Sequence, residues 1–132
     1  MRKLFKVSVK KFLSLSLIIL STQSYGNLEA TFEGKSAKLS LSIANTNESR
    51  SKGLMFQSSL KKNHGMIFIW PSSKKQGMWM KNTSIPLSVA YLSTDGRILE
   101  IYDMVPFSED SVCSSQKARM AVEVNQGWFS KN

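Results

Sequence analysis

The stretch Leu87-Ser-Val-Ala-Tyr-Leu92, followed by Ser-Thr-Asp-Gly and then Arg97-Ile-Leu-Glu-Ile-Tyr-Asp-Met-Val105, decides the fold. Both flanking segments are rich in aliphatic and aromatic residues, which is the composition of β-strands. The Asp95-Gly96 pair between them is a strong signal for a tight turn. This stretch therefore predicts an antiparallel hairpin and favours a β-rich protein.

Further strand-like segments lie on both sides of this hairpin. Residues 37–43 and 119–124 alternate between the two sides of a strand, and residues 66–70 form an apolar run that ends at Pro71. Shorter candidates are Leu28–Phe32 and residues 77–81. The pattern predicts a mainly β fold, a compact small barrel or sandwich of about seven short strands with one or two short helices.

The remaining segments are expected to be a helix and loops. Thr46-Asn47-Glu48-Ser49 offers capping side chains, which predicts a short helix to about Lys52 that Gly53 stops. Residues 72–76 and 106–117 are polar and are expected to be loops. We find no alternation of strands and helices that would predict a parallel sheet.

Residues 1–26 have the pattern of a secretory signal peptide. Residues 12–20 form an h-region of nine residues, about half of the roughly 20 that span a bilayer, and Ser24 and Gly26 suit cleavage after Gly26. The basic n-region before it contains Arg2, Lys3, Lys6, Lys10 and Lys11. We therefore expect a single periplasmic or secreted domain, residues 27–132, without a stable membrane span; an uncleaved anchor is the alternative.

Removal of this segment leaves 13 Lys and Arg against 9 Asp and Glu, a net charge of +4 instead of +9. No dense basic stripe with interleaved aromatic residues is present, so we predict no nucleic-acid partner. An envelope glycan or a periplasmic protein is the expected partner. The oligomeric state is left open.

Soft metal ligands give a second possibility. Thioethers suit Cu(I), and Met78 and Met80 lie two residues apart with His64 elsewhere in the chain. Methionine also fills β-cores, which we favour for these residues, so we predict no cofactor. Cys113 is the only cysteine, and it excludes an intramolecular disulfide.

The segment Met78-Trp-Met-Lys-Asn-Thr-Ser-Ile-Pro-Leu87 joins apolar and polar residues and is the suspected site. In one interpretation Asn82 and Thr83 hydrogen-bond the backbone of a turn. In a second, Lys81, Asn82 and Thr83 line a pocket with Trp79 and Trp70 and bind a polar ligand. Catalysis by a lysine would need a pKa lowered by burial.

Five ordered segments resemble the domain-of-unknown-function 192 (DUF192) family of small prokaryotic proteins, many of which have secretion signals. The matching segments are Arg50 with Gly53-Leu-Met-Phe56, Gly65-Met-Ile-Phe-Ile69, Trp79-Met-Lys-Asn-Thr83 with Ile85-Pro-Leu87, Asp95-Gly-Arg-Ile98, and Glu123-Val-Asn125 with Gly127. The resemblance implies a compact β-rich fold and no agreed activity. Ser88 departs from the family pattern, which usually has Asp there.

We therefore predict an exported binding or accessory protein of the envelope, leaning away from an enzyme. Its candidate site is Trp79, Lys81, Asn82 and Thr83, with Arg50, Arg119 and Glu123 as possible polar supports. The alternatives are a wall- or glycan-acting hydrolase that uses Glu123 or Asp103, and a periplasmic Cu(I)-binding protein.

Overall fold

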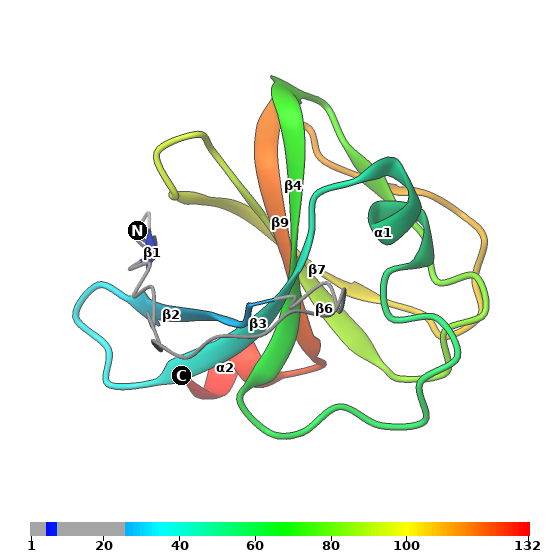
Figure 1. The fold of residues 1–132 in the computed structure, drawn as a ribbon, viewed down its shortest axis with the longest axis horizontal. Helices are drawn as coiled ribbons and strands as arrows, with labels where there is room; N and C mark the ends of the chain where they lie inside the picture. The colour runs from blue at the N-terminus through cyan, green and yellow to red at the C-terminus, as the bar shows by residue number, and fades with distance from the viewer. Residues whose placement is uncertain (1–4, 8–25) are drawn as a thin grey trace, which may run out of the picture.

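Seven strands form one sheet in the order β1-β2-β3-β4-β9-β6-β7, and β5 and β8 form a second, two-stranded sheet (Figure 1). The structure is a computed structural model that describes residues 5–7 and 26–132. The strands of the large sheet are β1 (Phe5–Val7), β2 (Leu28–Phe32), β3 (Lys38–Ala44), β4 (His64–Lys74), β9 (Ala118–Asn125), β6 (Leu87–Leu92) and β7 (Ile98–Met104). The remaining elements are β5 (Gly77–Met78), β8 (Val112–Cys113), α1 (Asn47–Lys52) and α2 (Trp128–Lys131).

The predicted mainly β class is confirmed, and the two short helices are present. No pairing joins β1 to β7 among the described residues, so the large sheet is not closed into a barrel. A sandwich-like arrangement fits the structure, because apolar side chains are buried on both faces of the sheet. In Figure 1, α1 lies on one side of the β4–β9 pair and α2 on the other.

The expectation that no strands run parallel was wrong. Strands β3 and β4 pair in parallel, with Ser42 opposite Met66, and the connection between them contains α1. Parallel neighbours need such a crossover, usually through a helix. A helix of only six residues gives too weak a periodic signal to reveal the crossover from sequence.

The predicted hairpin of β6 and β7 is confirmed, with Leu87 opposite Met104. The predicted helix is confirmed as α1, with Thr46 as N-cap and Gly53 as C-cap. Two boundaries were wrong: β4 continues past Pro71 to Lys74, with an irregular register after Ile69, and β5 ends at Met78. The polar segment 106–117 also contains the short strand β8.

Strand β9 lies between β4 and β6. Its side chains alternate between two hydrophobic clusters, one on each face of the sheet. Val122 and Val124 pack with Trp128 and Phe129 of α2 in one cluster. Ala121 packs on the other face, with Phe68, Val89 and Tyr91 among its cluster. Glu123 has the same alternation as Ala121, so it faces the second cluster.

The predicted signal peptide falls mainly outside the described residues. Only Gly26 and β1, which pairs antiparallel with β2, belong to that segment and are described. Over the described ranges, no helix is long and apolar enough to cross a membrane.

Candidate functional site

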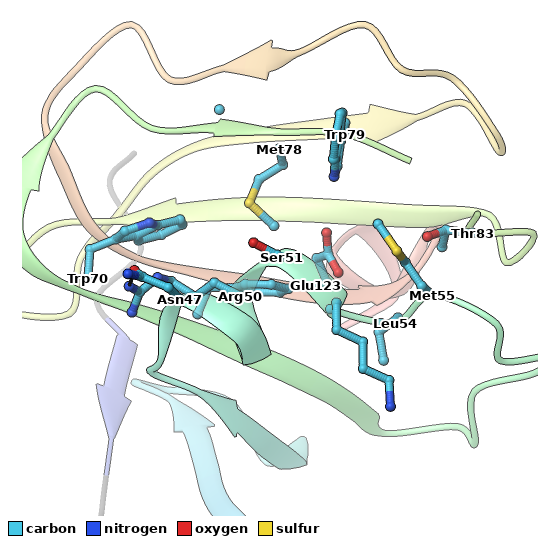
Figure 2. A pocket seen from close by; sticks show the side chains of 14 residues that line it. Asn47, Arg50, Ser51, Leu54, Met55, Trp70, Met78, Trp79, Thr83 and Glu123 are labelled. Atoms are coloured by element: carbon cyan, nitrogen blue, oxygen red, sulfur yellow. Dashed lines mark hydrogen bonds between the residues drawn. The ribbon is translucent and has the colours of Figure 1, made fainter. Parts of the chain in front are cut away.

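A pocket of about 330 Å³ opens on the face of the sheet that carries Glu123 (Figure 2). This volume is in the range of small-molecule sites, which is about 300–1,000 Å³. Its walls come from α1 and the residues after it, from β4, from β5 and from the loop that follows. The lining residues are Asn47, Arg50, Ser51, Lys52, Gly53, Leu54, Met55, Phe68, Trp70, Gly77, Met78, Trp79, Thr83 and Glu123.

Glu123 is the only carboxylic acid among the residues that line this pocket. It is opposite Met66 on β4 and Val89 on β6, so apolar side chains flank it on both sides within the sheet. The side chain is 3% exposed. An acid at this position is costly, because burial removes the water that would solvate its charge.

No hydrogen bond or ion pair to the Glu123 carboxyl group occurs among the described residues, whose three ion pairs involve other acids. Among the described residues that are buried or half-buried, each side-chain oxygen either has a hydrogen-bond partner or is in contact with solvent. The residual exposure of Glu123 therefore belongs to its carboxyl oxygens, and Figure 2 shows them in the middle of the pocket. Burial raises the pKa of Glu123 from 4.5 to about 8.

Arg50 supplies a cation to one end of the same pocket. Its guanidinium donates hydrogen bonds to the backbone oxygen of Ile69 at 2.9 Å and to Oδ1 of Asn47 at 2.6 Å. A guanidinium has five N–H groups, so donors remain for a ligand. Thr46 and Ser49 fix the start of α1 through a reciprocal capping box, which sets the position of the helix that carries Arg50.

Aromatic rings and thioethers make the apolar walls. Phe68 and Trp70 lie with ring centroids 6.3 Å apart and planes inclined by 23°. Trp79 is 43% exposed and lines the pocket with Met55 and Met78. Such walls with a few directed polar groups are typical of ligand pockets.

The residues of the predicted loop site form a turn, and only some of them line the pocket. Thr83 lines the pocket, and its hydroxyl donates to the backbone oxygen of Lys81 at 2.9 Å, as the turn interpretation expects. Asn82 is exposed and has a φ of 51°, in the left-handed region that asparagine tolerates. Lys81 lies 3.8 Å from Glu109 and 5.2 Å from the Trp79 ring centroid. Lys81 and Asn82 are not among the lining residues.

Arg119 and Asp103 are also outside this pocket. Nε of Arg119 donates to the backbone oxygen of Trp70, which ties β9 to β4. Asp103 accepts a hydrogen bond from Ser88 at 2.6 Å, and both line a separate pocket with Phe129. Glu123 and Asp103 therefore face opposite sides of the sheet and do not form a carboxylate pair. Ser88, which departs from the family pattern, is remote from Glu123 for the same reason.

Of the predicted copper ligands, Met78 and Met80 belong to one buried cluster, and His64 lies elsewhere. Met78 lines the pocket, Met80 is 2% exposed in the core, and His64 lies at the start of β4 with Nδ1 3.1 Å from the backbone oxygen of Lys62. The described residues contain no group of three or more His, Cys, Asp or Glu that could hold a metal ion.

Asn47, Ser51 and Met55 line the pocket, although the sequence pattern did not predict them as site residues. The signal that could have indicated them is local: they lie on, or just after, a capped helix that is followed by the apolar run Leu54-Met-Phe56.

The chain belongs to the DUF192 family, described as an uncharacterized ACR, whose profile matches residues 28–132. The resemblance that the sequence suggested is thus confirmed. No curated protein matches the chain.

Two solved structures are similar. A protein described as a "putative transcription regulator" from Sinorhizobium meliloti 1021 is 31% identical, with a TM-score of 0.73, over 75% of this chain and 78% of that chain. A protein of unknown function from Novosphingobium aromaticivorans DSM 12444 is 29% identical, with a TM-score of 0.69, over 71% and 68% of the two chains.

Proposed function

We propose that this protein is an exported binding protein of the cell envelope that takes a small polar ligand, such as a fragment of the wall, in the Glu123 pocket. The observation that carries the proposal is the carboxyl group of Glu123, which is 3% exposed and has no partner among the described residues. A buried acid without a partner destabilises a fold, so its presence beside a pocket favours a ligand role. The signal-peptide pattern of residues 1–26 supports the envelope location.

A binding role is favoured over hydrolysis because one carboxyl group lines the pocket. Hydrolysis of glycosides ordinarily uses two carboxyl groups roughly 5–10 Å apart. Glu123 and Asp103 lie on opposite faces of the sheet, so the pair that the hydrolase alternative needs is missing from this arrangement.

Thermal melting against wall muropeptides, oligosaccharides and Ag(I), as a stand-in for Cu(I), tests the proposal. A ligand at about 100 times its dissociation constant stabilises by roughly 2.7 kcal/mol, a rise on the order of 10 °C for a domain of this size. We expect the rise with muropeptides or oligosaccharides, and its loss in Glu123→Gln. The matched control is Glu109→Gln, which changes an exposed acid outside the pocket.

Either of two results would overturn the binding proposal. One is a panel without any rise. The other is a rise that is equally large in Glu123→Gln, which would locate the ligand elsewhere. A rise with Ag(I) alone would favour the Cu(I) alternative, whose predicted thioethers are Met78 and Met80.

A further inference from the structure

We infer that the Glu123 pocket recognises a ligand with both a primary ammonium and a carboxylate, such as a free amino acid or the end of a short peptide. The ammonium would bind Glu123 and the carboxylate would bind Arg50. This inference rests on the proposed function, and it replaces a general polar ligand by one chemical class.

The acid end of the pocket requires a donor. Ionised carboxyl oxygens accept hydrogen bonds and offer none, and no described residue donates to Glu123. No lysine or arginine among the described residues forms an ion pair with Glu123, although Arg50 and Lys52 line the same pocket. Its raised pKa keeps Glu123 protonated in the free protein at pH 6.5, and its ionised form would take its counter-charge from the ligand. An ammonium group supplies the charge and up to three N–H donors at once. A sugar hydroxyl supplies a donor but no charge.

The walls beside the acid also favour a cation. Phe68, Trp70 and Trp79 line the pocket with their aromatic rings. The faces of such rings attract cations, and the attraction grows when the cation is shielded from water. An aromatic wall of this kind is compatible with an ammonium group bound at Glu123.

The other end of the pocket, at Arg50, favours an anionic group. Arg50 is held by its bonds to Ile69 and Asn47 and keeps free N–H groups, which suit a carboxylate. In Figure 2 the labelled Arg50 and Asn47 lie beside Trp70, whereas Glu123 lies toward the middle. A ligand with one cationic and one anionic group complements both residues, and a purely cationic ligand would be repelled by Arg50.

Calorimetric titration at pH 6.5 tests the inference, with the dipeptide alanyl-alanine as probe. N-acetyl-alanyl-alanine lacks the amine, alanyl-alanine amide lacks the carboxylate, and N,N′-diacetylchitobiose lacks both. Repeating each titration in two buffers with different ionisation enthalpies counts the protons released. The other titratable groups near Glu123 are Arg50 and Lys52, which line the pocket, and Tyr91 with its neighbours Glu100, Tyr102 and Cys113. The α-amino group of the dipeptide also titrates at about pH 8, so the comparison with Glu123→Gln decides whether a released proton comes from Glu123.

We expect the dipeptide to bind with release of close to one proton, and each of the two blocked forms to bind roughly 10- to 100-fold more weakly. Glu123→Gln should abolish the proton release. Arg50→Gln should bind the dipeptide and its amide equally, while the matched control Arg97→Gln, at the β6–β7 turn outside the pocket, keeps the preference.

Two results would overturn the inference and leave the proposed function standing. One is tighter binding of chitobiose than of the dipeptide, with the effect of Glu123→Gln retained. The other is equal binding of the dipeptide and its N-acetyl form without proton release. Failure of every probe to bind would overturn the ligand class, and failure of the wall panel as well would overturn the proposed function.

Discussion

At the residue scale, the account depends on one acid in an apolar setting. Glu123 has Met66 and Val89 as its neighbours across the sheet, where a hydrophobic residue would be expected to be more stable. Functional sites commonly lower the stability of a fold, and an unpartnered acid at a pocket is what such a site would show. The sequence could indicate Glu123 only as one of several charged residues, because burial without a partner is a property of the folded chain.

The pH dependence of stability gives a first test of this setting. The pKa of Glu123 is raised to about 8 in the folded state, above the ordinary value of 4.5 that it regains on unfolding. Between these values the folded state holds a proton that the unfolded state has lost. The stabilisation is therefore fully present below about pH 4.5 and is lost as the pH rises through about 8.

We accordingly predict that Glu123→Gln gains stability relative to the wild type as the pH rises. The gain should approach roughly 1.4 kcal/mol per pH unit at the steepest and level off above about pH 8. Urea denaturation of both proteins at several pH values measures the difference. A difference that stays constant from pH 5 to pH 9 would show that Glu123 is not desolvated as described.

Close packing behind the pocket gives a second prediction. A Cβ atom on Gly65 would lie 2.2 Å from the backbone oxygen of Glu123. Gly65→Ala must push β4 away from β9 and should cost at least about 1–3 kcal/mol of unfolding free energy. Gly77→Ala is the control, because its Cβ would be 3.3 Å from Sγ of the exposed Cys113, which can yield. Equal stability of the two variants would contradict the described packing.

At the scale of elements, prediction from sequence succeeded where the signal is local. The β6–β7 hairpin follows from its strand composition and Asp95-Gly96, and α1 follows from Thr46 and Gly53. The parallel pairing of β3 with β4 depends on which distant strands meet, and no local pattern specifies it. The pocket could not be predicted for the same reason. Its lining residues extend from Asn47 to Glu123 in the sequence and come together only in the folded sheet.

The cap of α1 links this element to the site. Thr46→Ala removes the hydroxyl that accepts from the backbone N–H of Ser49 at 3.1 Å. We expect a loss of about 0.5–2 kcal/mol of unfolding free energy, together with weaker ligand binding, because α1 holds Arg50. Thermal melting and calorimetry measure the two effects. Thr94→Ala, in the turn between β6 and β7, is the control; if it weakens binding as much, α1 does not position the pocket.

At the scale of the whole molecule, the two faces of the large sheet are covered by different hydrophobic clusters. The face with α2 is packed by Trp128 and Phe129 and carries the pocket of Ser88 and Asp103, whereas the face with α1 carries the pocket around Glu123. Membership of the DUF192 family indicates no ligand, so the ligand is inferred from the pocket. Ser88 lies on the α2 face, so its departure from the family pattern leaves the Glu123 pocket unchanged.

Cleavage of the predicted signal peptide would determine the N-terminus of the mature chain. Cleavage after Gly26 would remove β1 and leave β2 as an edge strand of the sheet. We expect intact mass spectrometry of the protein from the envelope fraction to give a chain that begins at Asn27. A full-length mass in that fraction would instead support the uncleaved anchor.

The central claim is that the Glu123 carboxyl group is buried, unpartnered and reached by the ligand. A carboxyl ¹³C NMR titration of this residue, with and without a wall-muropeptide digest, tests the claim most directly. The account predicts a pKa of about 8 in the free protein, which falls when the ligand ammonium binds. A pKa near the ordinary 4.5 that does not respond to the digest would contradict it.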